Sequence, residues 1–106
     1  MRKRFMRVLV FFDLPTETNE DIRQYTRFRK YLIGQGFIMV QKSVYSKIAL
    51  NGVASNTVIA NMRKNLPKSG LVQTLIVTEK QYQSIEFMVG EGQKETVDSQ
   101  QRLLVF

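Results

Sequence analysis

Residues 5–15 read FMRVLVFFDLP, and the first eight of them decide how this chain folds. Those eight are mostly β-branched, aromatic or otherwise apolar, which is typical of a strand, and a proline shortly after them stops the pattern. Successive side chains of a strand point to opposite faces, so Phe5, Leu9 and Phe11 share one face and the even-numbered residues share the other. Both faces are therefore apolar, which indicates a strand that is covered on two sides.

The rest of the chain supplies five more candidate elements around this strand. In chain order they are a helix from 18 or 19 to about 33, two strands joined by a turn or bulge within 37–50, a helix from 51 to before 67, a strand at 71–78 and a short strand at 103–106. The order β-α-β-β-α-β predicts an α+β fold, the ferredoxin-like plait with both helices on one face of an antiparallel sheet. We expect one domain over residues 1–106, with a core plait at 1–78 and a C-terminal extension at 79–106 for dimer or partner contact.

The strand at 71–78 repeats the two-sided apolar pattern. Leu71 and Leu75 alternate there with Val72 and Ile76. Two helices cover only one face of a sheet, and a second face in water would show polar residues at alternate positions. We therefore expect a homodimer packed through sheet faces, with a second copy of the chain covering the other side. The alternative is that the tail of the same chain folds back over it.

Length and composition limit the classes of function. The 106 residues, with 43% apolar and 24% charged, fit one small globular domain rather than two. The chain has no Cys and no His, which excludes disulfide scaffolds, thiolate zinc sites, Cys nucleophiles and imidazole bases. No apolar run reaches the ~20 residues of a membrane span, and the basic N-terminus does not continue as a signal peptide. We expect a cytoplasmic protein with no membrane partner.

The charge indicates a polyanionic partner. The net charge is +7, and an excess of this size in a short chain favours nucleic acid. Residues 1–70 carry 13 basic and 4 acidic side chains, whereas residues 71–106 carry 3 basic and 5 acidic ones. The first two thirds of the chain should therefore form the surface that faces the polyanion.

Two groups of basic residues are candidate phosphate contacts. They are Arg2, Lys3, Arg4 and Arg7 at the N-terminus and Arg23, Arg27 and Lys30 on the first helix. The three helix residues follow the i, i+4, i+7 spacing of one stripe, which suits phosphate contact, although a solvated helix face has the same pattern. The predicted buried face of that helix consists of Ile22, Tyr25, Phe28 and Leu32. Arg29 falls beside it, so we expect it to pair with a carboxylate or to reach past the sheet edge.

Asp13 is the candidate catalytic and metal-binding residue. A carboxylate at a strand end can bind a divalent cation that activates water or a phosphate oxygen. The structural alternative is a turn residue that bonds backbone amides before Pro15. One carboxylate is a poor metal site, and a two-fold axis near Asp13 would bring two together. Ser43 and Tyr45 are supporting candidates, as hydroxyls that contact phosphate or a metal-bound water, or that satisfy the local backbone.

Four segments of the chain together resemble one protein family. They are FFDLP after the first strand, RFRKYL followed by GF, then QKSVY, and later LIVTEKQY. The family is that of CRISPR-associated protein 2, the companion of the CRISPR integrase in spacer acquisition. The segments GFIMVQKSVYSK and VTEKQ are most similar to members from type II-like systems, whose effector is a single RNA-guided nuclease.

The resemblance implies a function and its partners. A ferredoxin-like homodimer would bridge two dimers of the integrase, CRISPR-associated protein 1, and lie across a double-stranded prespacer DNA, while the partner performs integration. The resemblance also implies a magnesium-dependent endonuclease, usually one that cleaves RNA, with Asp13 as the metal ligand. The QKSVY segment places Ser43 and Tyr45 at matching positions, and many members have Phe in place of Tyr45.

Three hypotheses for function follow. The leading one is a DNA-scaffolding subunit of the spacer-integration complex. The alternative is a stand-alone metal-dependent endoribonuclease of toxin type, for which the sequence offers Asp13 as the plausible carboxylate ligand. A small-molecule-sensing domain of the same fold is disfavoured by the strongly positive first seventy residues.

Overall fold

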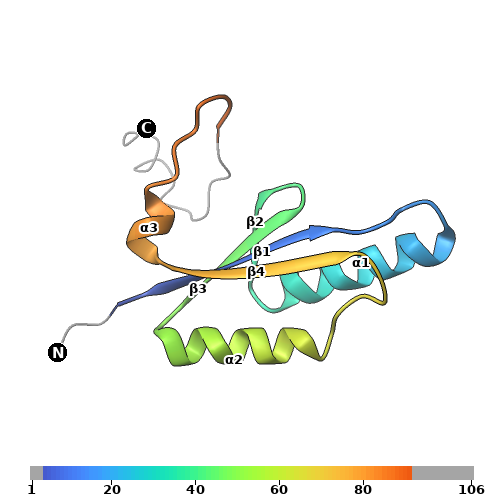
Figure 1. Ribbon diagram of the computed structural model, residues 1–106, viewed down its shortest axis with the longest axis horizontal. Coiled ribbons are helices and arrows are strands. Elements are labelled where there is room, and N and C mark those ends of the chain that lie inside the picture. Colours follow the sequence, from blue (N-terminus) through green and yellow to red (C-terminus); the bar gives the residue numbers. More distant parts are fainter. Residues whose placement is uncertain (1–3, 92–106) are drawn as a thin grey trace.

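The computed structural model describes residues 4–91 and shows a four-stranded sheet with two long helices on one side (Figure 1). The elements are β1 (Met6–Asp13), α1 (Asn19–Gly34), β2 (Ile38–Gln41), β3 (Val44–Ala49), α2 (Gly52–Arg63), β4 (Leu71–Thr78) and α3 (Glu79–Gln83). The order up to β4 is the predicted one, and α3 follows β4 directly. The strand expected at 103–106 lies outside the described residues.

The sheet has the strand order β2-β3-β1-β4, and its neighbouring strands are antiparallel. β1 lies in the interior, where Leu9 is opposite Ser46 of β3 and Leu75 of β4. Each βαβ unit is split, because β3 lies between β1 and β2 while β1 lies between β3 and β4. This is the ferredoxin-like plait predicted from the sequence.

The core lies between the sheet and the two long helices. Val8, Val10 and Phe12 of β1 are at most 5% exposed and pack in one cluster with Phe28 and Leu32 of α1. The Phe12 and Phe28 rings meet edge to face, with centroids 5.6 Å apart. The even-numbered face of β1 is thus the helix-covered one, as the alternation indicated.

One residue of the predicted buried face of α1 is not buried. Phe28 and Leu32 are fully buried and Tyr25 packs against the core, but Ile22 is 49% exposed. The prediction for Ile22 is wrong because the first turns of α1 project beyond the end of β1 (Figure 1). Helical spacing places Ile22 on the correct side of α1, but the sheet does not extend far enough to cover it.

Both long helices begin at side-chain caps that the sequence predicts. The Thr18 hydroxyl accepts a hydrogen bond from the Asp21 amide at 3.0 Å, and the Asp21 carboxylate accepts one from the Thr18 amide at 3.2 Å. At the start of α2 the Asn51 side-chain oxygen accepts from the Ala54 amide at 2.8 Å. These contacts satisfy first-turn amides that have no partner within the helix. Each helix therefore begins at a defined residue.

The extended segment 37–50 forms two strands, as predicted. β2 and β3 are joined by a tight turn at Lys42 and Ser43. The pairing shifts register between Met39 and Gln41, which is the irregularity expected near this turn. The turn brings Ser43 to the end of β1, where the Phe12 amide donates to the Ser43 carbonyl at 3.1 Å.

The second face of the sheet is apolar and partly open. Ile48, Leu71 and Leu75 on this face are each about half exposed, at 49–52%, whereas Leu9 near the centre is 8% exposed. Part of the face is covered by α3, whose Tyr82 is 8% exposed. The chain after β4 thus does return over this face, as one of the two expectations had it.

The sequence analysis did not predict α3 itself, although the chain contains a signal for it. Thr78 and Gln81 form a capping box, in which the Thr78 hydroxyl accepts from the Gln81 amide at 3.0 Å and the Gln81 side chain accepts from the Thr78 amide at 2.8 Å. A Thr followed three residues later by Gln is the sequence pattern of such a box. The helix has five residues, too few to show a periodic apolar face.

The helices of residues 4–91 are all too short or too polar to form a membrane span. The longest is α1, with 16 residues.

Candidate functional site

Asp13 is the last residue of β1, and it is exposed beside an open hollow. The hollow has a volume of about 190 Å³ and lies between the end of β1, the β2–β3 turn and the start of β4. Ser43 and Gln73 are the other polar residues that line it, and the rest of the wall is apolar. The arrangement places one accessible carboxylate next to a shallow apolar surface, where it can face a cation or a polar group of a ligand.

The loop between α2 and β4 packs closely against Asp13. Gly70 in this loop has φ +97°, in the left-handed region that favours glycine. A Cβ atom on Gly70 would lie 2.9 Å from the Asp13 carbonyl oxygen and 2.7 Å from the Leu14 side chain. The loop therefore fixes the backbone at the end of β1, and Asp13 leaves the sheet in a defined direction.

The chemistry of the donors around Asp13 fits a hydrated magnesium ion. Magnesium prefers oxygen ligands, keeps several waters and is often held by one or two carboxylates together with substrate phosphates. Asp13 is the one carboxylate that lines the hollow, and the Ser43 hydroxyl is a further oxygen donor. Residues 4–91 contain no group of three acidic, His or Cys side chains able to hold a metal. One chain thus offers a minimal site, which a second Asp13 would strengthen.

Ser43 and Tyr45 do not form the hydroxyl pair that the sequence suggested. Ser43 lies in the turn and lines the hollow. Tyr45 is 1% exposed, its ring stacks on Phe12 at 5.6 Å, and its hydroxyl accepts a hydrogen bond from Arg29 Nε at 3.0 Å. The two differ because Tyr45 belongs to the helix-covered face of β3, so its hydroxyl meets α1 rather than Asp13. Arg29 accordingly bonds to a hydroxyl, not to the carboxylate that was one expectation for it.

The basic stripe on α1 is exposed, but part of it is engaged within the chain. Arg23 pairs with Glu20 one turn earlier. Arg27 donates to the Leu66 carbonyl at 3.1 Å and so ties α1 to the loop after α2. Lys30 is exposed and completes the stripe. The stripe therefore presents positive charge to solvent, while Arg27 also has a structural contact.

Glu20 offsets some of the positive charge of this region. A hydrogen bond from the Gln24 side chain, with smaller effects of Arg23 and Lys68, lowers the pKa of the Glu20 carboxyl. The direction is expected, because neighbouring donors and cations favour the ionised form. Glu20 thus remains a carboxylate at neutral pH and competes with phosphates for Arg23.

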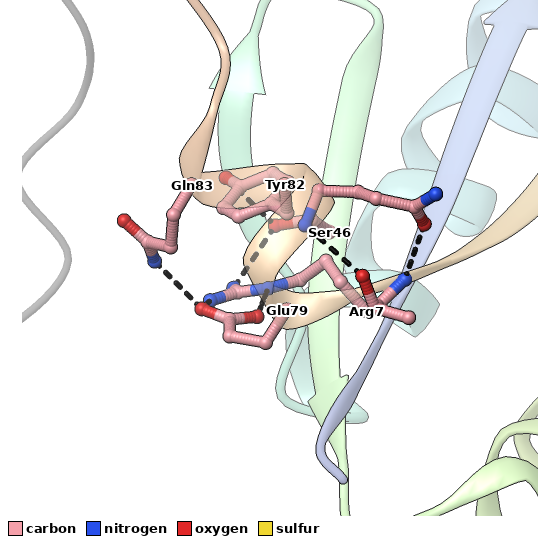
Figure 2. Close-up of polar contacts among 7 residues, drawn as sticks. Arg7, Ser46, Glu79, Tyr82 and Gln83 are labelled. Atoms are coloured by element: carbon pink, nitrogen blue, oxygen red, sulfur yellow. Dashed lines mark hydrogen bonds and ion pairs between the residues drawn. The ribbon is translucent and has the colours of Figure 1, made fainter.

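The N-terminal basic residues do not form one surface. Arg4 is exposed, and Arg2 and Lys3 lie outside the described residues. Arg7 is 4% exposed and forms two hydrogen bonds to Glu79 on α3, as Figure 2 shows. The expectation that Arg7 contacts phosphate is corrected by this burial, because its position in the middle of β1 directs it under α3.

The comparison with known proteins decides the family. The sequence model of the family described as CRISPR associated protein Cas2 matches residues 6–85, a range that spans every element from β1 to α3. The chain belongs to the Cas2 family. A Cas2 protein of Treponema denticola is 51% identical to it over 100 residues, which cover 94% of this chain and 99% of that protein.

Two further Cas2 relatives cover nearly the same part of the chain. A protein of Ligilactobacillus salivarius is 42% identical, over 94% of this chain and 99% of its own length. One of Streptococcus mutans is 43% identical, over 93% of this chain and 91% of its own. Each of these three relatives is named a CRISPR-associated endoribonuclease Cas2. The family resemblance inferred from four short segments is therefore confirmed over most of the chain.

The contact between Gly70 and Asp13 gives a first prediction. Gly70→Ala forces a side chain into a left-handed backbone and against the Asp13 carbonyl, so the free energy of unfolding should fall by at least about 1 kcal/mol. Urea unfolding measures this. Gly34→Ala is the matched control, because its Cβ would meet no atom within 4 Å, and it should leave stability unchanged or raise it. Equal stability of the two variants would contradict the prediction.

Proposed function

We propose that this Cas2 protein is a CRISPR adaptation subunit, a homodimer that binds double-stranded prespacer DNA and bridges two dimers of the integrase, CRISPR-associated protein 1. The observation that carries the proposal is the sheet, whose second face keeps exposed leucines while the helix side carries exposed cations. One side suits association with protein and the other suits a polyanion. With one carboxylate at its hollow, this chain is better equipped to hold DNA than to cut it, so integration is assigned to the partner.

The second copy of the chain is proposed to pack on the open part of the second face. Leu71 and Leu75 there are 52% and 50% exposed, and removing such surface from water drives association. A two-fold dimer uses the same patch on both copies, so one contact covers both. The Asp13 carboxylates lie at the end of β1 next to this patch, and the same contact would bring two of them into one cleft.

The dimer is tested by placing a charge in the patch. At micromolar concentration the protein should have the mass of a dimer by light scattering. Leu75→Glu should give a folded monomer, because an unpaired carboxylate in a buried interface is costly. Val53→Glu is the matched control, since Val53 is 76% exposed at the start of α2, and it should remain a dimer. A monodisperse monomer of the parent protein would contradict the proposal.

The DNA surface is proposed to consist of exposed cations. On the helix side these are Arg23, Arg27 and Lys30, and the N-terminus adds Arg4 with Arg2 and Lys3. Side chains of this kind contact phosphates and carry no information about base sequence. Binding should therefore be insensitive to sequence, as a scaffold for arbitrary prespacers requires.

Salt dependence tests the DNA surface. Duplex affinity should fall steeply as salt rises, with a logarithmic slope of roughly −0.9 per phosphate contact. Lys30→Gln should reduce the magnitude of that slope by about 0.9 for every duplex sequence tested. Lys80→Gln, which removes an exposed lysine of α3, is the matched control and should leave the slope unchanged. Strong sequence preference, or no salt dependence, would contradict the surface.

The proposal includes a magnesium-dependent endonuclease activity at Asp13. Asp13 of each protomer would hold the ion, with the Ser43 hydroxyl close by. Magnesium, when bound, supplies polarisation of a phosphate oxygen and a lower pKa for its water. The chain itself keeps the Asp13 carboxylate at the surface, orients it through the Gly70 contact and offers the apolar wall of the hollow to the nucleotide beside the phosphate.

A stand-alone endoribonuclease is the second candidate function. The names of the relatives favour it, since they describe those proteins as endoribonucleases. Under this alternative, cleavage of RNA is the principal activity, and binding of duplex DNA or of the integrase is incidental. The two candidates therefore differ in which assay depends on Asp13.

Asp13→Asn separates the two candidates. Asparagine keeps the shape of the side chain but loses the charge that holds a cation, so magnesium-dependent cleavage should be abolished while the fold and dimer persist. Spacer integration with the integrase should be largely unaffected. Glu17→Gln is the matched control, because Glu17 is an exposed carboxylate in the loop after Asp13 and does not line the hollow.

Both assays are run on the same preparation. Cleavage that is unchanged in Asp13→Asn would remove the catalytic assignment. Loss of integration with an intact dimer would remove the scaffold role that is independent of Asp13.

A further inference from the structure

Arg7 and Glu79 form a bidentate ion pair between β1 and α3. Arg7 Nε donates to Glu79 Oε1 at 2.8 Å, and Nη2 donates to Oε2 at 2.6 Å. The Arg7 side chain is 5% exposed and that of Glu79 is 23% exposed. The guanidinium carbon also lies 4.1 Å from the centre of the Tyr82 ring. Figure 2 shows the guanidinium enclosed by these side chains beneath α3.

The same arginine extends the network to β3. Nη1 of Arg7 donates to the Ser46 hydroxyl at 3.3 Å, and Ser46 donates to the Tyr82 hydroxyl at 3.2 Å. Ser46 is fully buried and Tyr82 is 8% exposed. The Glu79 amide adds a backbone bond to the Phe5 carbonyl at 2.9 Å. The five-residue α3 is thereby attached to two strands through polar contacts.

A polar attachment of this kind fixes the position of α3. A short helix that buried only one aromatic ring could slide over an apolar sheet face at little cost. The planar fork of Arg7 instead matches the Glu79 carboxylate in one orientation, and moving α3 would leave a buried guanidinium without its partner. The network therefore selects one location for α3, at the end of β1 opposite to Asp13.

We propose that Arg7 and Glu79 are positioning residues for the Asp13 site. By holding α3 over one end of the second face, they confine a second copy of the chain to the other end, where Asp13 lies. The inference rests on the proposed dimer, and it adds to that dimer what sets its register. The two Asp13 side chains meet because the alternative register is blocked by α3.

The geometry of a two-fold contact supports this role. Arg7 and Asp13 are six residues apart on β1, or roughly 20 Å. The exposed Leu71 and Leu75 face the Asp13 half, and Ile48, opposite Arg7 on β3, lies at the border of the covered part. A two-fold axis passes through the centre of the shared patch. For strands that cross the axis, a shift by one residue along β1 changes the Asp13–Asp13 separation by about 7 Å.

The test uses the absence of cysteine, which permits one spin label per chain. Lys68→Cys places the label in the exposed loop after α2, beside Gly70 and therefore near Asp13. The parent dimer should give one narrow label-to-label distance. Arg7→Met should speed amide hydrogen exchange in α3 and should lengthen or broaden the distance by about 7 Å or more. Glu79→Gln is a milder second variant with the same expected direction, for use if Arg7→Met does not fold.

Rescue distinguishes positioning from general damage. The double variant Arg7→Met/Glu79→Met removes both charges and keeps the volume, and such replacements of a buried pair are commonly neutral or stabilising. It should restore slow exchange in α3 and the narrow distance. Arg23→Met is the matched control, because it removes an exposed arginine paired with Glu20, and it should change neither measurement.

The possible failures are distinguishable. A dimer whose label distance is unchanged in Arg7→Met, with exchange in α3 accelerated, overturns the positioning role and leaves the proposed dimer intact. Unchanged exchange in α3 overturns the role as well, since the ion pair would not hold the helix. A monomeric parent protein overturns both the proposed dimer and this inference.

Discussion

β1 is the element on which the rest of the structure depends, because it is hydrogen-bonded along both edges and packed on both faces. Val8 and Val10 are fully buried under the helices, and Leu9 between them is 8% exposed on the other side. A strand in this position needs covering elements on two sides. The two long helices supply one cover and α3 supplies part of the other. The end of β1 then becomes the place where a side chain leaves the packed interior for solvent, and that side chain is Asp13.

The buried Arg7 is the main departure from the apolar pattern of β1. Removing a guanidinium from water is costly, and the ion pair with Glu79, the Ser46 hydroxyl and the Tyr82 ring offset that cost within one small network. An apolar residue at this position would bind α3 with less directional preference. The charge thus exchanges some stability for a defined location of α3, which leaves the Asp13 end of the face uncovered.

The two sides of the sheet suit different partners. Exposed cations gather on the helix side, although Glu20 neutralises part of their charge, whereas exposed leucines lie on the second face. The hollow at Asp13 lies where these regions meet, with one carboxylate per chain. Such a site is minimal for metal-assisted hydrolysis and becomes more favourable when two copies share it. A scaffold that holds nucleic acid between larger partners agrees with this distribution, and membership of the Cas2 family places it in CRISPR systems.

Local patterns in the sequence were enough to predict the element order, both helix caps, the hairpin after α1 and the two-sided character of β1, because periodicity and capping involve residues close together in the chain. The position of Asp13 at a strand end followed from the same signals. Only the tertiary structure decided that Arg7 is buried against Glu79, 72 residues away, and that the Tyr45 hydroxyl turns to Arg29. Both depend on which elements pack together, and the physical reason is that a contact between distant segments has no counterpart in local residue spacing.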